Sequence, residues 1–325
     1  MRSIIVVCIA TLSALAQAPL AIYESNPGPF VSLGKVAPNE LVSFAVLGAR
    51  SPRMIPELGP LPSELDGYSV TIEDVRQGLR PTRLLIVRID GAGCSSTWAT
   101  DSTCKVFAIT VQMPQTLALT TNVGVTAPAK PSFSVWKGGV QGLLTQFRAV
   151  SSNPTILTSS THVFKSPDAP CADTFDSDKS ATHEDGTCVD RSNPARPGEV
   201  IVIRALGLGA TAPMVPAGEP APAPPPRTLL PFVARMQAFV GTVLSPVGET
   251  TVRDVESSVL RTGSVGVYEV RVRIPDELTP EMPYCRSGGN LMVQIYQKAR
   301  NIEPPRVNTP EWSRSYATVC VQPYE

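Results

Sequence analysis

Proline is spread along the whole chain, at 33 of 325 residues. An interior proline removes a helical hydrogen bond and clashes with the preceding turn, so this distribution excludes long helices. The segments between the prolines are short, and several alternate in hydrophobicity with a period of two. Residues 267–274 (VYEVRVRI) show the pattern most clearly. Such alternation is typical of a strand with one face in the core and one face in water.

Eight segments carry a strand pattern. We expect strands at residues 41–47, 68–72, 83–89, 106–111, 200–206, 267–274, 291–297 and 316–321. Turn sequences separate them, such as Asp90-Gly91 and Ser287-Gly288-Gly289-Asn290. Many short strands with regular turns predict an all-β fold of the sandwich type.

Two of the predicted strands recur later in the chain. Residues 38–48 match residues 197–207 at an offset of 159, and residues 106–114 match residues 267–275 at an offset of 161. Two matches at nearly one offset indicate a single module used twice. We therefore expect β-sandwich modules at 24–130 and 192–325, joined by an irregular connection over 131–191.

Seven prolines lie within residues 213–226. This stretch is predicted to be extended and to run over the surface as an excursion between two strands.

The N-terminus has the form of a secretory signal peptide. Arg2 supplies a positive charge, residues 4–14 are apolar, and Ala14-Leu15-Ala16 offers a cleavage site. The predicted signal is residues 1–16, and it is too short to span a membrane. No later stretch is long and apolar enough to be a span, so a secreted or periplasmic protein is expected.

Six cysteines follow the predicted signal, and an even number in an exported chain indicates disulfides. Six cysteines allow about 15 connectivities. We expect local pairs, because Cys94 and Cys104 flank one polar loop and Cys171 and Cys188 flank another. Cys285 and Cys320 then remain, on either side of the last two predicted strands.

The charge balance argues against two classes of partner. Lys and Arg number 28, as do Asp and Glu, so the chain carries no basic footprint for nucleic acid and no polybasic membrane patch. His162 and His183 are the only histidines, and the G-x-S-x-G signature of a serine hydrolase does not occur. We predict a protein that is not an enzyme and needs no cofactor.

The second module carries motifs of a known domain family. Residues 193–203 (NPARPGEVIVI) with 205–209 (ALGLG), and residues 266–275 (GVYEVRVRIP), resemble the C-terminal domain shared by uncharacterised secreted proteins of Solibacter-type acidobacteria. Residues 61–72 (LPSELDGYSVTI) in the first module fit the preceding half of that region. The resemblance implies a bacterial protein with tandem immunoglobulin-like sandwiches and no assigned activity. The cysteines in its turns depart from the family pattern.

Two loops are candidate ligand sites. An acidic stretch contains Asp173, Asp176, Asp178, Glu184 and Asp185, which are the oxygen ligands that calcium prefers, although the EF-hand spacing is absent. In the loop from Cys94 to Cys104, Trp98 has only small or polar neighbours, and Asp101 could orient a ligand stacked on it. Either the indole docks onto the sandwich or it is exposed for binding.

One glycine motif is assigned to structure. Residues 207–212 (GLGATA) imitate a dinucleotide-binding turn, but Pro213 and Pro216 forbid the helix that such a site needs. A glycine turn that ends a strand is expected instead.

The sequence therefore predicts a non-catalytic extracellular binding or structural protein whose partner is an unknown extracellular protein or glycan. Two alternatives stay open: a secreted carbohydrate-active enzyme on a β-sandwich, and a calcium-stabilised adhesin.

Overall fold

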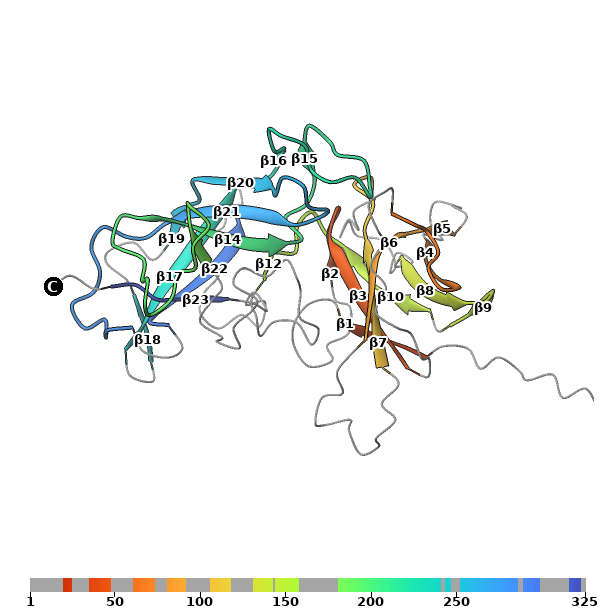
Figure 1. Cartoon of the computed structure of the whole chain (residues 1–325), viewed down its shortest axis with the longest axis horizontal. Helices are drawn as coiled ribbons and strands as arrows, with labels where there is room; N and C mark the ends of the chain where they lie inside the picture. Colours follow the sequence, from red (N-terminus) through yellow and green to blue (C-terminus); the bar gives the residue numbers. More distant parts are fainter. Residues whose placement is uncertain are drawn as a thin grey trace, which may run out of the picture.

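The computed structural model describes residues 20–24, 35–47, 61–73, 81–91, 106–117, 131–142, 144–157, 181–240, 243–246, 252–285, 289–298 and 316–322. Every regular element in these ranges is a β-strand, so the chain is all-β, as predicted. Strands β1–β11 form the N-terminal half and strands β12–β23 the C-terminal half, and the two lie beside each other along the longest axis (Figure 1). No helix that could cross a membrane is found within the described ranges.

The N-terminal half contains two main sheets. The first has the order β1 (Leu20–Glu24), β3 (Leu41–Leu47), β7 (Val106–Gln112) and β6 (Leu85–Gly91). The second has the order β10 (Thr145–Gln146), β8 (Ser132–Lys137), β4 (Tyr68–Glu73) and β5 (Thr82–Arg83), with β9 (Val140–Gln141) paired to β8. A short parallel pair, β2 (Lys35–Val36) and β11 (Arg148–Ala149), adds a third sheet.

The C-terminal half also contains two sheets. The first has the order β12 (Thr155–Ile156), β14 (Val200–Leu206), β21 (Tyr268–Arg273), β20 (Ser257–Leu260), β16 (Arg227–Thr228) and β15 (Thr211–Ala212), with β13 (Ala181–His183) paired to β14. The second has the order β18 (Val243–Pro246), β17 (Phe232–Val240), β22 (Leu291–Gln297) and β23 (Ala317–Val319), with β19 (Val252–Asp254) paired to β17.

The same pairing scheme occurs in both halves. The order β3-β7-β6 corresponds to β14-β21-β20, and β10-β8-β4 corresponds to β23-β22-β17. The repeated segments also pair in the same register. Leu41 lies opposite Gln112, and their counterparts at offsets of 159 and 161, Val200 and Arg273, lie opposite each other.

Each half has its own core between its two main sheets. In the N-terminal half, Val42 and Ile109 pack with Val70 and Phe133, which stacks on Phe147 with 4.3 Å between ring centroids. In the C-terminal half, side chains of β14 and β21 pack with those of β17 and β22. Along β21, buried and more exposed residues alternate, which confirms the predicted half-buried strand.

The sequence placed most of the long strands correctly. Residues 41–47, 200–206 and 291–297 were predicted with the bounds that the structure has. The prediction of an irregular connection over 131–191 is wrong for its described part. Residues 132–137 form β8 and complete the second sheet of the N-terminal half, while β12 and β13 pair with β14 of the C-terminal half. Among the described strands the longest is β17, and it was not predicted.

Candidate functional site

The clearest cluster of buried polar groups lies where the two halves meet. It begins at the turn between β2 and β3, where Asn39 adopts the left-handed conformation with φ of 62°. Asn tolerates this conformation better than most residues. The turn directs Asn39 and Glu40 inward, and both are buried, at 1% and 0% exposure. The Ala37 backbone N–H donates to Glu40 Oε2 over 2.6 Å.

Asn153 connects this turn to the C-terminal half. Its side-chain amide donates to Glu40 Oε1 at 3.0 Å and to the Lys35 carbonyl at 3.1 Å. Its backbone N–H donates to the carbonyl of Gly207 at 2.6 Å. Gly207 has a φ of 70°, and a Cβ there would stand 2.2 Å from the Asn153 carbonyl oxygen. Only glycine fits both the conformation and this close approach.

A second link runs through Asn39. Its amide donates to the Tyr268 hydroxyl at 3.0 Å, and that hydroxyl donates to the Gly209 carbonyl. Gln112 Nε2 donates to Asn39 Oδ1 at 2.5 Å, while Gln112 Oε1 accepts the backbone N–H of Gly218 at 2.6 Å. The buried amides of Asn39 and Gln112 therefore bond to strand and loop groups of the other half.

The proline-rich stretch 213–226 takes part in this contact. It contains no helix, as predicted, but it does more than cross the surface, because it docks on the N-terminal half. Gln115 Nε2 donates to the Val215 carbonyl at 2.8 Å, and Gly218 lies against the side chains of Leu85 and Leu61.

An apolar cluster lies beside the polar one. Leu157, Leu206 and Val267 are buried together, and Leu41 of the N-terminal half packs against them. We call the whole contact the joint: the polar residues Asn39, Glu40, Gln112, Asn153 and Tyr268, the glycines that approach them, and this cluster. Burial of both polar and apolar groups makes the joint resemble a core more than a mobile contact between domains.

Burial alters the acidity of the joint. It raises the pKa of Glu40 from 4.5 to about 8, although the hydrogen bonds from Ala37 and Asn153 act in the opposite direction. It also raises the pKa of the Tyr268 phenol above its usual range. Both side chains are therefore neutral near neutral pH, which suits a buried site that has no cation among the described residues.

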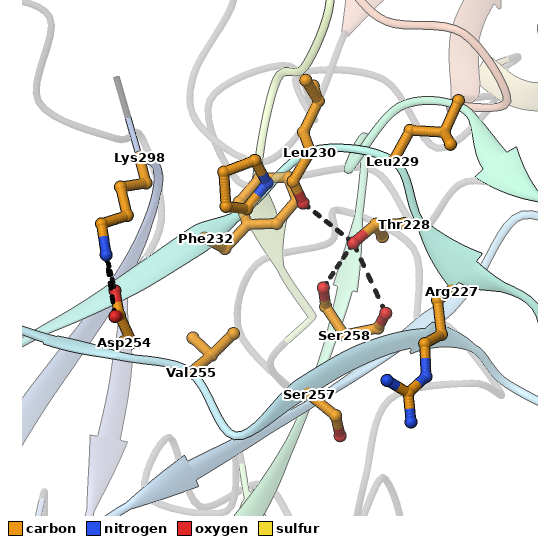
Figure 2. A pocket seen from close by; sticks show the side chains of 11 residues that line it. Arg227, Thr228, Leu229, Leu230, Phe232, Asp254, Val255, Ser257, Ser258 and Lys298 are labelled. Carbon is orange, nitrogen blue, oxygen red and sulfur yellow. Dashed lines mark hydrogen bonds and ion pairs between the residues drawn. The ribbon is translucent and has the colours of Figure 1, made fainter. Parts of the chain in front are cut away.

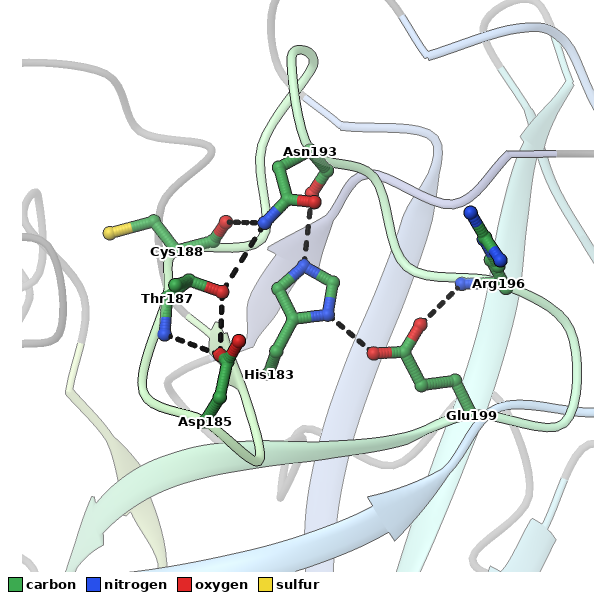
Figure 3. Close-up of polar contacts among 7 residues, drawn as sticks. All are labelled: His183, Asp185, Thr187, Cys188, Asn193, Arg196 and Glu199. Atoms are coloured by element: carbon green, nitrogen blue, oxygen red, sulfur yellow. Dashed lines mark hydrogen bonds and ion pairs between the residues drawn. The ribbon is translucent and has the colours of Figure 1, made fainter.

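A second polar cluster surrounds His183 (Figure 3). The Nδ1 atom faces Glu199 Oε1, and Nε2 lies 3.1 Å from the Asn193 carbonyl. A carboxylate and a carbonyl both accept, so these two partners favour the imidazolium form, in which both ring nitrogens donate. Burial opposes this charge, but the hydrogen bonds to Glu199 and Asn193 prevail and raise the pKa of His183. In the imidazolium form neither nitrogen can act as a general base.

The acidic stretch is only partly described. Glu184 pairs with Arg271 at 2.6 Å, and Asp185 Oδ1 accepts the backbone N–H and the hydroxyl of Thr187 at 2.8 and 2.6 Å. These bonds lower the pKa of Asp185. Asp173, Asp176 and Asp178 lie outside the described residues. Within the described ranges no group of three potential metal ligands occurs, and the calcium site stays a prediction.

A pocket of about 440 Å³ opens where β16 and β20 approach β17 and β19 (Figure 2). Most of its polar groups bond to each other. Lys298 pairs with Asp254 at 2.6 Å, and the hydroxyls of Thr228 and Ser258 lie 2.5 Å apart. Arg227 is exposed and lines the same pocket, and it is the group best placed to meet a ligand.

The predicted disulfides are confirmed in one case. Cys285 and Cys320 are bonded, across β22 and β23 as expected. Cys188 is also disulfide-bonded, but its predicted partner, Cys171, lies outside the described residues. The same holds for Cys94, Cys104, Trp98 and Asp101, so the loop predicted to bind a ligand is not placed. The predicted signal peptide likewise lies outside the described ranges.

The residues of the joint were not predicted as a site. The glycines at 207 and 209 were assigned to a turn that ends a strand, and both do have positive φ. Their second role, the close approach of Gly207 to Asn153, depends on residues far away in sequence. The available signal was the sequence repeat, in which Asn39 and Glu40 align with Gly198 and Glu199.

Comparison with protein families finds no match. Comparison with curated protein sequences finds none either. Among solved structures, "BspA_C_mut" is similar at 11% identity, with 86% of this chain and 94% of that one covered and a TM-score of 0.17. The "Streptococcus agalactiae AgI/II polypeptide BspA C terminal domain (WT)" is similar at 10% identity, with 94% and 99% covered and a TM-score of 0.15. At these TM-scores the matches carry no argument.

Proposed function

We propose that this chain is a non-catalytic extracellular protein whose two halves act as one rigid unit and present their outer loops to an extracellular protein or glycan. The joint carries this proposal. A catalytic cleft between domains usually needs a hinge, whereas here Glu40 and Asn39 are buried and hydrogen-bonded across the contact. A fixed spacing between binding loops is what such a contact maintains.

Other features support parts of the proposal. The strand order that occurs in both halves supports two immunoglobulin-like sandwiches, a fold whose loops commonly carry binding function. The bond between Cys285 and Cys320, with the signal-like N-terminus, supports export to an oxidising compartment. Sequencing the N-terminus of the exported protein should find Gln17 first.

Small-angle X-ray scattering tests whether the two halves form a rigid unit. It should be measured at about pH 6, where Glu40 is protonated. The scattering of the disulfide-bonded protein should fit one arrangement of the halves. Gly207→Ala should increase the maximum dimension, because its Cβ would clash with the Asn153 carbonyl. Gly263→Ala is the matched control, because Gly263 has a similar φ and open space around it. If the wild-type curve already needs several arrangements, the proposal is wrong.

The pocket at Arg227 supports a second candidate, binding of a small polar ligand such as a sugar. An exposed cation and hydroxyl groups beside apolar Leu229 and Phe232 give the mixed lining that such sites have. A glycan-array screen of the wild type and Arg227→Ala tests it, and a ligand that binds both equally would exclude this pocket.

A further inference from the structure

Glu40 is a buried carboxyl group at the joint with no described cation beside it. Its two oxygens accept from the Ala37 backbone and the Asn153 amide, both neutral donors. Among the residues that the structure describes, no Lys, Arg or His forms an ion pair with it. A buried carboxylate without a counter-ion is strongly disfavoured, so the group stays protonated or its surroundings must open.

The other groups around Glu40 do not replace a counter-ion. From β21, the Tyr268 phenol is near enough for its pKa to respond to a charge on Glu40, but it is itself neutral, and its hydrogen bond is to Asn39. From β2, Lys35 contributes its backbone carbonyl to Asn153. From the C-terminal half, Gly207 approaches with no side chain at all, and a Cβ there would lie 3.3 Å from the Glu40 carboxyl carbon.

We propose that Glu40 makes the joint sensitive to pH: the two halves are locked while its carboxyl group is protonated and separate when it ionises. Ionisation would place a negative charge between Asn153 and Gly207, the residues that connect the halves. Water must then enter to solvate it, and the hydrogen bonds that cross the joint would be exchanged for bonds to water. This inference rests on the rigid joint proposed above.

The direction of the effect follows from the two pKa values. The pKa of Glu40 is about 8 in the folded protein and near 4.5 when the chain is unfolded. Between these two pH values the folded state therefore binds a proton on Glu40 that the unfolded state has lost. The stabilisation is fully present below about pH 4.5 and is lost as the pH rises through about 8.

Urea unfolding at a series of pH values tests the proton linkage. Between about pH 5.5 and 7, unfolding of the wild type should release about one proton more than unfolding of Glu40→Gln, which has nearly the same shape but does not titrate. Glu64→Gln is the control, because Glu64 is an exposed carboxyl group, at 50%, whose printed ion pair is with Arg83 and not with a histidine. Equal proton release by wild type and Glu40→Gln overturns the proposal.

Scattering at about pH 6 and 9.5 tests the opening itself, on either side of the pKa of Glu40. The maximum dimension of the wild type should grow at the higher pH, and that of Glu40→Gln should not. If protons are released on unfolding as expected but the maximum dimension does not change with pH, the proposed separation of the halves is wrong. The proposal of a rigid unit would still stand. A flexible wild type at about pH 6 would instead refute the rigid unit.

Infrared spectroscopy of the wild type covers the case in which Glu40→Gln does not fold. A protonated carboxylic acid signal should persist at about pH 6.5 in the folded protein and disappear by about pH 9.5, because ordinary carboxyl groups are already ionised at the lower value. Absence of that signal at the lower pH would also overturn the proposal.

Discussion

Glu40 and Glu199 make the same hydrogen bond at the same turn of the two halves, 159 residues apart. In each, Oε2 accepts the backbone N–H three residues earlier, over 2.6 and 2.8 Å. The other oxygen differs in its partner: Glu40 faces Asn153 inside the joint, and Glu199 faces His183 near the surface. One repeated turn therefore serves an uncharged buried contact in one half and an ion pair in the other.

Gly207→Ala should be strongly destabilising. The new Cβ would meet the Asn153 carbonyl oxygen at 2.2 Å, and this backbone atom cannot move aside as a flexible side chain would. With the unfavourable positive φ added, we expect a loss of about 2–4 kcal/mol in the free energy of unfolding, measured in urea. Gly263→Ala should lose only about 1 kcal/mol, because nothing lies within 4 Å of its Cβ. Equal losses would mean that Gly207 matters only for its φ.

Asn153→Ala should weaken the joint by removing the donor from two acceptors, the buried Glu40 carboxyl group and the Lys35 carbonyl. The Glu40 carboxyl oxygen and the Lys35 carbonyl would both lose their bond to the amide. We expect a loss of about 2–4 kcal/mol, measured by urea unfolding near pH 6, and a further rise in the pKa of Glu40. Asn193→Ala is the control, because that amide is exposed and its bonds are long, at 3.3 Å. A loss no larger than that of the control would contradict the role of Asn153.

The sequence predicted the parts of the fold that depend on local pattern. Strands β3, β14 and β22 are short apolar runs between turn residues, and their bounds were read directly. Strand β17 was missed, and its sequence FVARMQAFV includes five residues with good helix propensity: two alanines, an arginine, a methionine and a glutamine. Pairing with β22 over seven residue pairs makes it a strand despite that preference.

The joint could not be predicted in the same way. Asn39 and Tyr268 are separated by 229 residues, and Glu40 and Asn153 by 113. Nothing in the local pattern distinguishes Glu40 from an exposed turn residue, and its counterpart Glu199 is indeed partly exposed. Only the packing of the two halves decides which of the two carboxyl groups is buried.

The bond between Cys285 and Cys320 should contribute substantially to stability. It closes a loop with a sequence separation of 35 around β22 and β23. The chain-entropy model gives about 3–4 kcal/mol for a loop of this size. Cys285→Ser with Cys320→Ser should lower the urea midpoint accordingly, and Cys285→Ser alone should lose a similar amount, because either change breaks the bond. A loss below about 1 kcal/mol would show that the packing of β22 and β23 holds them in place without the disulfide.

His183 should titrate above the ordinary histidine range. Burial lowers its pKa, but the hydrogen bonds to Glu199 and the Asn193 carbonyl outweigh burial and raise it. Because the folded pKa lies above the unfolded value of about 6.5, the stabilisation is complete below that pH and is lost as the pH rises through the folded pKa. NMR titration of the ring protons should therefore give a midpoint above about 6.5.

Two variants make the His183 titration decisive. His183→Gln identifies its resonance, because His162 is the only other histidine in the chain. Glu199→Gln removes the negative charge beside Nδ1. The midpoint of His183 should then fall, because burial still lowers its pKa while the contribution of Glu199 that raised it is lost. The advantage of wild type over His183→Gln in unfolding free energy should shrink from about pH 6 to 8. A wild-type midpoint at or below about 6.5 would contradict this prediction. The ring would then be mostly neutral at neutral pH, and one of its nitrogens would be free to accept a proton.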